Sequence, residues 1–225
     1  MNRYDIYASI HKALRNFMGD TLAAVGRLDV EDDAEVAETL AQVRGLLATL
    51  RMHLDAENRF VHLAMHDRDP GSADRTAVDH EGHEHAIERL ESLAGETQFR
   101  SGEQRGMAVA ALYRELAVFV AENLEHMNYE ETKNNEALWR THSDEELRGI
   151  ERAIVAELTP EKKMTVFRWM IPALPPAGRA ELLAKLRQSA PAPVIDAVLQ
   201  IAKRNLSDRD WAKLSGALGF MPKAA

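Results

Sequence analysis

The sequence predicts an all-α protein in which a four-helix bundle is followed by a set of shorter helices. Three observations lead to this fold class. Apolar residues recur at spacings of three and four through four long segments, and no segment shows the alternation of a strand. Short loops separate the long segments, which favours antiparallel neighbours in an up-down-up-down order. After Trp139 the chain changes to short segments that are punctuated by proline.

The first two long segments are separated by the acidic loop LDVEDD. The first is expected at about residues 4–25, where Tyr7, His11, Leu14 and Met18 share one face. The second begins near Asp33 and keeps its 3-4 apolar spacing as far as the sequence DRDPGS, a strong helix breaker. Two helices joined by one loop are therefore predicted.

The third and fourth long segments follow the same logic. The third is expected at about residues 73–94 and is predicted to stop at Gly95, because glycine commonly ends helices. The fourth extends over about residues 103–139. Its inward-facing apolar residues are expected to be Leu112, Leu116, Phe119, Val120 and Leu124.

The remainder of the chain carries helix-start signals rather than long periodic runs. Ser143 with Glu146 forms a capping box, and Thr159 is followed by proline at the first helical position. About five short helices are expected between residues 143 and 219. The predicted domains are a bundle at residues 1–140 and a C-terminal helical subdomain of unknown role at residues 141–225.

Composition narrows the range of functions. The chain of 225 residues has a formal net charge of -8, which argues against nucleic acid or an anionic membrane as a partner. No apolar run approaches the roughly 20 residues of a membrane helix, and the start resembles no secretory signal, so the expected location is the cytoplasm. The absence of cysteine excludes disulfides, iron–sulfur clusters and thiolate metal sites. Any metal must be held by histidine, carboxylate or tyrosine.

Two histidines each lie four residues before a glutamate, in the sequences HLDAE and HMNYE. His53 with Glu57 and His126 with Glu130 would each place an imidazole and a carboxylate on one helix face, about 6 Å apart. Each pair is therefore a candidate half of a metal site.

In an antiparallel bundle, the beginnings of the first and third helices lie level with the later parts of the second and fourth. His11 comes early in the first helix, and His80 and His83 come early in the third. All four helices should thus bring imidazole to one level of the core. Without a metal ion, this many buried polar groups would lack partners. A metal centre is therefore predicted.

Four other histidines are predicted to lie outside the centre. At about 100° per helical residue, His62, His66 and His85 are turned away from the predicted ligands. His142 lies in the sequence THSDEE and is expected to be solvated.

Taken together, these motifs resemble those of the hemerythrin-like, or HHE cation-binding, proteins over about residues 4–140. The matching sequences are SIHKALR, HLDAENRF, DHEGHEH and HMNYEE. The resemblance implies a four-helix bundle that holds a non-heme di-iron centre with terminal histidines and bridging carboxylates. Carried over to this chain, the terminal ligands are His11, His53, His80 or His83, and His126, and the bridges are Glu57 and Glu130.

Two departures from the pattern of oxygen-carrying hemerythrins leave alternatives open. The third helix has HxxH where HxxxH is usual, and the fourth has HxxxEE where HxxxxD is usual. The ligand on the third helix is thus His80 or His83, and the second bridge is Glu130 or Glu131. With its additional carboxylate, the chain is more similar to relatives implicated in iron handling and in sensing of nitric oxide or oxygen than to a pure oxygen carrier.

Histidine nitrogen and carboxylate oxygen suit iron, with manganese or zinc as alternatives. The expected function is binding of dioxygen or a related small molecule, such as nitric oxide or peroxide, for storage, sensing or detoxification. One alternative is a di-iron enzyme that oxidises an organic substrate. Another is a metal-responsive module that contacts a protein partner or a second copy through its C-terminal helices. Tyr7 and Asn123 are expected either to donate hydrogen bonds near the centre or to serve only as packing residues.

Overall fold

The computed structural model describes residues 3–219, and this part of the chain is helical without a strand. By packing, the described residues fall into two compact units. Unit 1 consists of residues 3–8 and 17–157, and unit 2 of residues 9–16 and 158–219. The predicted domains, residues 1–140 and 141–225, stay a prediction. Within the described range, no helix is both long enough and apolar enough to cross a membrane.

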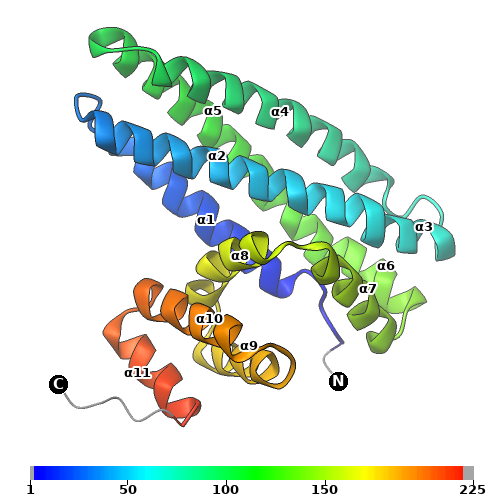
Figure 1. Cartoon of the computed structure of the whole chain (residues 1–225). Coiled ribbons are helices and arrows are strands. Elements are labelled where there is room, and N and C mark those ends of the chain that lie inside the picture. Colours follow the sequence, from blue (N-terminus) through cyan, green and yellow to red (C-terminus); the bar gives the residue numbers. More distant parts are fainter. Residues whose placement is uncertain (1–2, 220–225) are drawn as a thin grey trace. The chain divides into compact units, whose positions relative to one another are not determined.

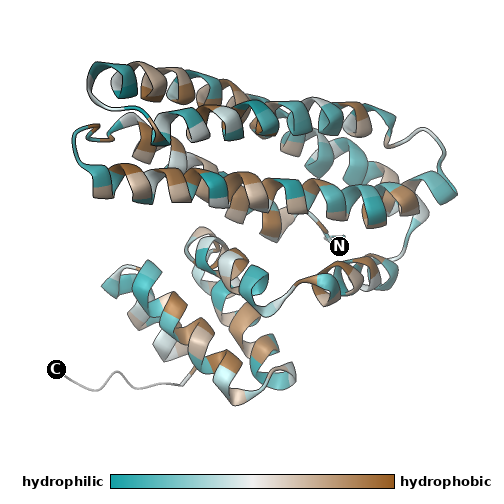
Figure 2. Cartoon of the chain, turned by 45° about the horizontal axis from the view of Figure 1, so that its top comes forward, coloured by the Kyte–Doolittle hydropathy of each residue, from teal (hydrophilic) through white to brown (hydrophobic). Residues whose placement is uncertain are grey.

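Four long helices correspond to the four predicted segments, and Figure 1 shows them lying alongside one another. Helix α4 packs against both α2 and α5. In Figure 2, apolar and polar residues alternate around these helices, as burial of one face requires. The four helices are α1 (Ala8–Gly26), α2 (Asp33–Ala56), α4 (Asp74–Gln98) and α5 (Gly102–Tyr129).

Two ends of these helices differ from the prediction. Helix α1 begins at Ala8 because the Asp5 carboxylate accepts hydrogen bonds from the backbone N–H groups of Tyr7 and Ala8, at 3.0 and 3.1 Å. Helix α4 continues through Gly95 to Gln98. Ala94 and Thr97 on either side of that glycine are fully buried, and this burial outweighs the weak helix propensity of one glycine.

The second and fourth predicted helices each contain a π-helical segment. After α2 come η1 (Glu57–His62) and α3 (Leu63–Arg68), and after α5 come η2 (Glu130–Asn134) and α6 (Asn135–Thr141). A π-helix has wider turns, closed by hydrogen bonds between residues i and i+5. Side chains within and beyond each segment therefore point in directions that regular helical spacing does not predict.

The core of unit 1 is made by the apolar stripes of the long helices. On α5, Leu112, Leu116, Phe119 and Val120 are buried as expected. Leu124 is 42% exposed, so its predicted inward position is wrong. The buried face of α5 passes instead through Asn123, His126 and Met127.

A second apolar cluster lies where the π-helical segments end. It joins α3 and α6 with α7 (Asp144–Glu157). The predicted capping box at the start of α7 is present, since the Ser143 N–H donates to the Glu146 carboxylate at 2.7 Å and the Glu146 N–H donates to the Ser143 hydroxyl at 3.3 Å. Buried members of this cluster are Ile6, Tyr7, Val61, Met65, Ala73, Ala137, Leu138 and Leu147.

Helices α8 (Pro160–Ala173), α9 (Pro176–Ser189), α10 (Ala192–Asn205) and α11 (Asp208–Ala217) form most of unit 2. Helices α8 and α9 begin at proline, and α10 has proline within its first two positions. The start of α8 is the one that the sequence Thr159-Pro160 predicts. Together with α7, these four helices make five in the described part after residue 143. Their shared core consists of Ile171, Leu183, Val198, Ala202 and Leu214.

Candidate metal centre

Six of the eight predicted metal ligands form two overlapping groups. Within each group, one ligand atom from every residue lies within 4.8 Å of the others. Both groups contain the same two glutamates, with a different histidine pair on each side. The first group is His11, His53, Glu57 and Glu130, and the second is Glu57, His80, His126 and Glu130.

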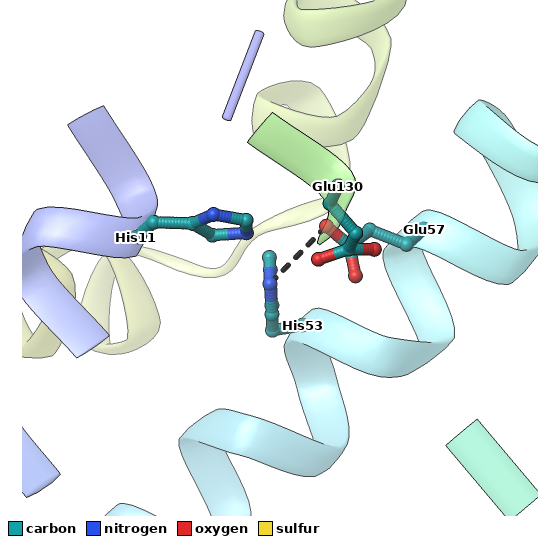
Figure 3. Close-up of side chains that lie close together, drawn as sticks. All are labelled: His11, His53, Glu57 and Glu130. Carbon is teal, nitrogen blue, oxygen red and sulfur yellow. Dashed lines mark ion pairs between the residues drawn. The ribbon is translucent and has the colours of Figure 1, made fainter. Parts of the chain in front are cut away.

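The first group is shown in Figure 3, where the rings of His11 and His53 lie beside the two carboxylates. His53 Nε2 is 3.2 Å from Glu57 Oε1, the ion pair drawn as a dashed line. This contact joins residues four apart, as the HLDAE spacing predicts. His11 comes from the uninterrupted helix α1, and the other three residues come from α2 and the two π-helical segments.

In the second group, nitrogen and oxygen ligand atoms converge from α4, α5 and both π-helical segments. His80 Nε2 lies 3.0 Å from His126 Nε2 and 3.5 Å from Glu57 Oε2. Glu130 Oε2 lies 3.4 Å from His126 Nε2. Imidazole nitrogen and carboxylate oxygen are ligands that suit iron, manganese and zinc. These buried groups are thus able to hold a metal ion.

Both shared glutamates are the first residues of π-helical segments, Glu57 of η1 and Glu130 of η2. The preceding histidines lie in regular α-helix, which preserves the four-residue contact between each histidine and its glutamate. The wider turns begin at the glutamates themselves. Such π turns are frequent at functional sites.

The outer ring nitrogens of two candidate ligands also have partners. His80 Nδ1 lies 2.8 Å from Asn58 Oδ1, and His126 Nδ1 lies 3.3 Å from Asp79 Oδ2. Each imidazole thereby directs Nε2 toward the glutamates. Outer contacts of this kind fix the ring orientation of metal-binding histidines and raise their basicity. Sequence reasoning missed Asn58 and Asp79, which are marked only by being adjacent to Glu57 and His80.

The chain matches no protein-family model, no curated protein and no solved structure. The chemistry of this site must therefore be inferred from its own residues.

Removing the outer partner of His80 is expected to weaken metal binding without abolishing it. Asn58→Ala should lower metal affinity by about 10–100-fold, because the His80 ring loses the acceptor that fixes its tautomer and orientation. Titration of the metal-free protein in competition with a chelator measures this change. A matched control is Asp55→Ala, which removes an exposed side chain from the adjoining helix α2 and should leave the affinity unchanged. Equal affinities for the two variants would contradict the role of Asn58.

His62 belongs to neither group, as predicted, but it is buried beside the site instead of being turned away from it. Its Nε2 lies 3.1 Å from Thr76 Oγ1, and its ring stacks on that of His80 with centroids 4.8 Å apart. The prediction assumed 100° per residue, but His62 ends the π-helical segment η1, whose wider turns bring it inward. Burial, and then the neighbouring His80, lowers the pKa of His62.

A polar network extends from His62. Asn134, the last residue of η2, donates from Nδ2 to Thr76 Oγ1 at 3.2 Å and to the Tyr7 hydroxyl at 3.5 Å. Tyr7 is 1% exposed. Burial, followed by the charges of Glu130 and Glu57, raises its pKa well above the ordinary value. The Tyr7 hydroxyl therefore keeps its proton.

His83 and Glu131 belong to neither group. The His83 ring lies perpendicular to that of His126, with centroids 4.9 Å apart. Burial, and then the neighbouring His126 and His80, lowers the pKa of His83 to about 4, so its ring is neutral at pH 7. Glu131 is half-buried, and its backbone carbonyl accepts a hydrogen bond from Asn135.

Burial alone would lower the pKa of His126, but the hydrogen bond and the negative charge of Glu130 outweigh it and raise this pKa. The shared carboxylates therefore set the electrostatics of the second group. They favour positive charge there, as a divalent cation would supply.

Of the other histidines that were predicted to lie outside the centre, His66 and His85 are exposed as expected. The solvated position predicted for His142 is wrong, because this residue is buried. Its backbone N–H donates to the Leu138 carbonyl of α6 at 2.7 Å, and its Nδ1 lies 2.8 Å from Thr141 Oγ1. Asn123 is also buried and donates to the Phe119 carbonyl at 2.8 Å.

Proposed function

We propose that this chain holds a non-heme di-iron centre in a hemerythrin-like four-helix bundle. The centre binds dioxygen or a related small molecule, such as nitric oxide or peroxide, for storage, sensing or detoxification. The observation that carries this proposal is that two histidine pairs share the same two glutamates. A carboxylate has two oxygen atoms and can bridge two metal ions, one toward each histidine pair.

The arrangement of helices supports the proposal. Helices α1, α2, α4 and α5 each contribute one histidine. Glu57 and Glu130 directly follow α2 and α5, so the HxxxE pattern occurs at the end of each of these two helices. This is the order of ligands that the resemblance to hemerythrin-like proteins implies.

The ligand set fits two divalent iron ions, with manganese or zinc as alternatives. Each ion would receive two histidine nitrogens and one oxygen from each shared glutamate. Because iron commonly accepts six ligands, such a site leaves positions for a molecule from outside. Bound iron would supply the electrons for reversible binding or reduction of that molecule.

The chain's own residues prepare the site for this ligand set. Glu57 and Glu130 provide two negative charges in the interior, which offset part of the charge of two cations. Asn58 and Asp79 hold His80 and His126 in place. Tyr7 keeps its proton and lies in a hydrogen-bonded network with Asn134 and Thr76.

Metal analysis and an optical spectrum test the proposal. Protein purified under iron-replete conditions should contain about two iron ions per chain and, once oxidised, should absorb in the near-ultraviolet ligand-to-metal region. Reversible spectral change with oxygen supports binding, whereas oxygen consumption that depends on an added organic substrate would favour an oxidative enzyme. His85→Ala provides the control, because this exposed histidine should not affect metal content. Folded protein that takes up no metal would refute the proposal.

A further inference from the structure

A pocket of about 500 Å³ lies on unit 1, lined entirely by residues of α4 and α5. One of its lining residues is His126, which is also a candidate metal ligand. The pocket is open rather than enclosed, so it connects the solvent with a member of the second metal-binding group.

The inner wall of the pocket is formed by side chains that contact this ligand. Asp79 lines the pocket and lies 3.3 Å from His126 Nδ1. His83 lines it as well and packs its ring against His126. His83 is only 5% exposed, and its Nδ1 is buried without a hydrogen-bond partner. A polar molecule that enters the pocket would thus find an imidazole able to bind it beside the centre.

Gly82, an exposed residue in the middle of α4, lines the pocket. A Cβ atom at this position would meet no other atom within 4 Å, so the space beside it is open. Glycine inside a helix costs roughly 0.5–1 kcal/mol relative to alanine, and packing does not demand it here. A larger side chain at position 82 would occupy open space that borders the pocket.

The lining is predominantly polar and carries charges of both signs. Arg75 is positioned between Asp79 and Glu125, at 3.9 and 3.6 Å, and lies over the Tyr129 ring at 4.2 Å. Arg89 and Glu122 also line the pocket. Such a surface offers hydrogen bonds to a polar molecule, whereas an apolar gas gains little from it.

We propose that this pocket is the port through which a small polar molecule, of the size of azide or hydrogen peroxide, reaches the half of the centre that contains His80 and His126. Gly82 keeps the port open. This inference rests on the proposed function, because it assumes that a metal ion is held beside His126.

An obstacle that is added beside Gly82 after folding tests the port. The chain has no cysteine, so Gly82→Cys introduces a single thiol that can be capped with a bulky maleimide after folding and metal loading. Gly95→Cys is the matched control. Gly95 lies on the same helix, likewise has no atom within 4 Å of a built Cβ, and does not line the pocket.

The measurement is the binding of azide to the oxidised, metal-loaded protein, followed by rapid-mixing absorbance. Capping at position 82 should slow association by about tenfold or more and slow dissociation by the same factor, because a port changes the barrier and leaves the Kd unchanged. Capping at position 95 should change neither rate. Equal rates for the two capped proteins would overturn the port while leaving the metal centre intact.

A second measurement uses the metal-free protein. Diethyl pyrocarbonate should modify His83 through the pocket, and the cap at position 82 should protect His83 while the cap at position 95 should not. Exposed His66 is the internal reference for reagent concentration. Unchanged modification of His83 under both caps would also overturn the port. If no metal is bound at all, which metal analysis shows before any rate is measured, the proposed function and the port are both wrong.

Discussion

Replacing Glu57 with glutamine is expected to reduce metal content from about two ions per chain to nearly none. Replacing His80 with alanine is expected to leave about one. Glu57 belongs to both histidine groups, so the loss of its charge affects both positions, whereas His80 belongs to one group only. An amide retains an oxygen atom but is a much weaker ligand than a carboxylate. The difference between the two variants measures whether the glutamates are shared.

Metal content after dialysis against buffered iron, measured by elemental analysis, distinguishes these outcomes. Circular dichroism of each variant establishes that its helices are formed. Glu130→Gln should behave like Glu57→Gln, and His11→Ala should behave like His80→Ala, because the two groups are equivalent in this respect. If Glu57→Gln kept a full single ion while His80→Ala kept none, the two groups would not share a bridge.

Removal of metal is expected to lower the midpoint of thermal unfolding by on the order of 10 °C. An ion that binds only the native state, at a concentration 1,000 times its Kd, contributes about 4 kcal/mol, and each kcal/mol shifts the midpoint of a chain of this size by about 2–4 °C. Without metal, the buried carboxylates of Glu57 and Glu130 are left with their contacts with the histidines. Scanning calorimetry of loaded, chelator-treated and reloaded protein measures the shift.

The matched control for stability is Glu57→Gln with and without added metal. Because this variant is expected to bind little metal, its unfolding midpoint should not respond to the addition. Reloaded native protein should regain its original midpoint, which separates metal loss from irreversible damage. A loaded protein and a metal-free protein with the same midpoint would contradict a centre that joins helices of the native fold.

Regular helical spacing was sufficient to predict much of the candidate site. The HxxxE pairs depend on contacts within one helix, and His11 and His80 depend only on the order and direction of long helices. His80 and His83 could not be separated in this way, because residues three apart share a face. In the structure, His80 Nδ1 contacts Asn58 while its Nε2 faces the glutamates. Such contacts between helices depend on packing that no local pattern encodes.

The errors in the predictions also have specific physical causes. His62 was misplaced because no residue pattern marked the change from α-helix to π-helix at Glu57. His142 was expected in solvent because its neighbours are polar. In the structure it caps the end of helix α6, and its side chain is buried. The end of α4 was predicted at glycine, but buried contacts on both sides of Gly95 extend the helix.

Each of the two π-helical segments changes the helical register of the residues that follow it. A π turn holds one residue more than an α turn, so each segment is equivalent to a single-residue insertion into an otherwise regular helix. In a chain that lacked the extra residue of each segment, the histidines and glutamates of HLDAE and HMNYE would keep their relation, since they precede it. His62 and Asn134, which follow the glutamates, would face elsewhere. Insertion of one residue in each helix is therefore a route by which the surroundings of a metal centre can change while its ligands remain in place.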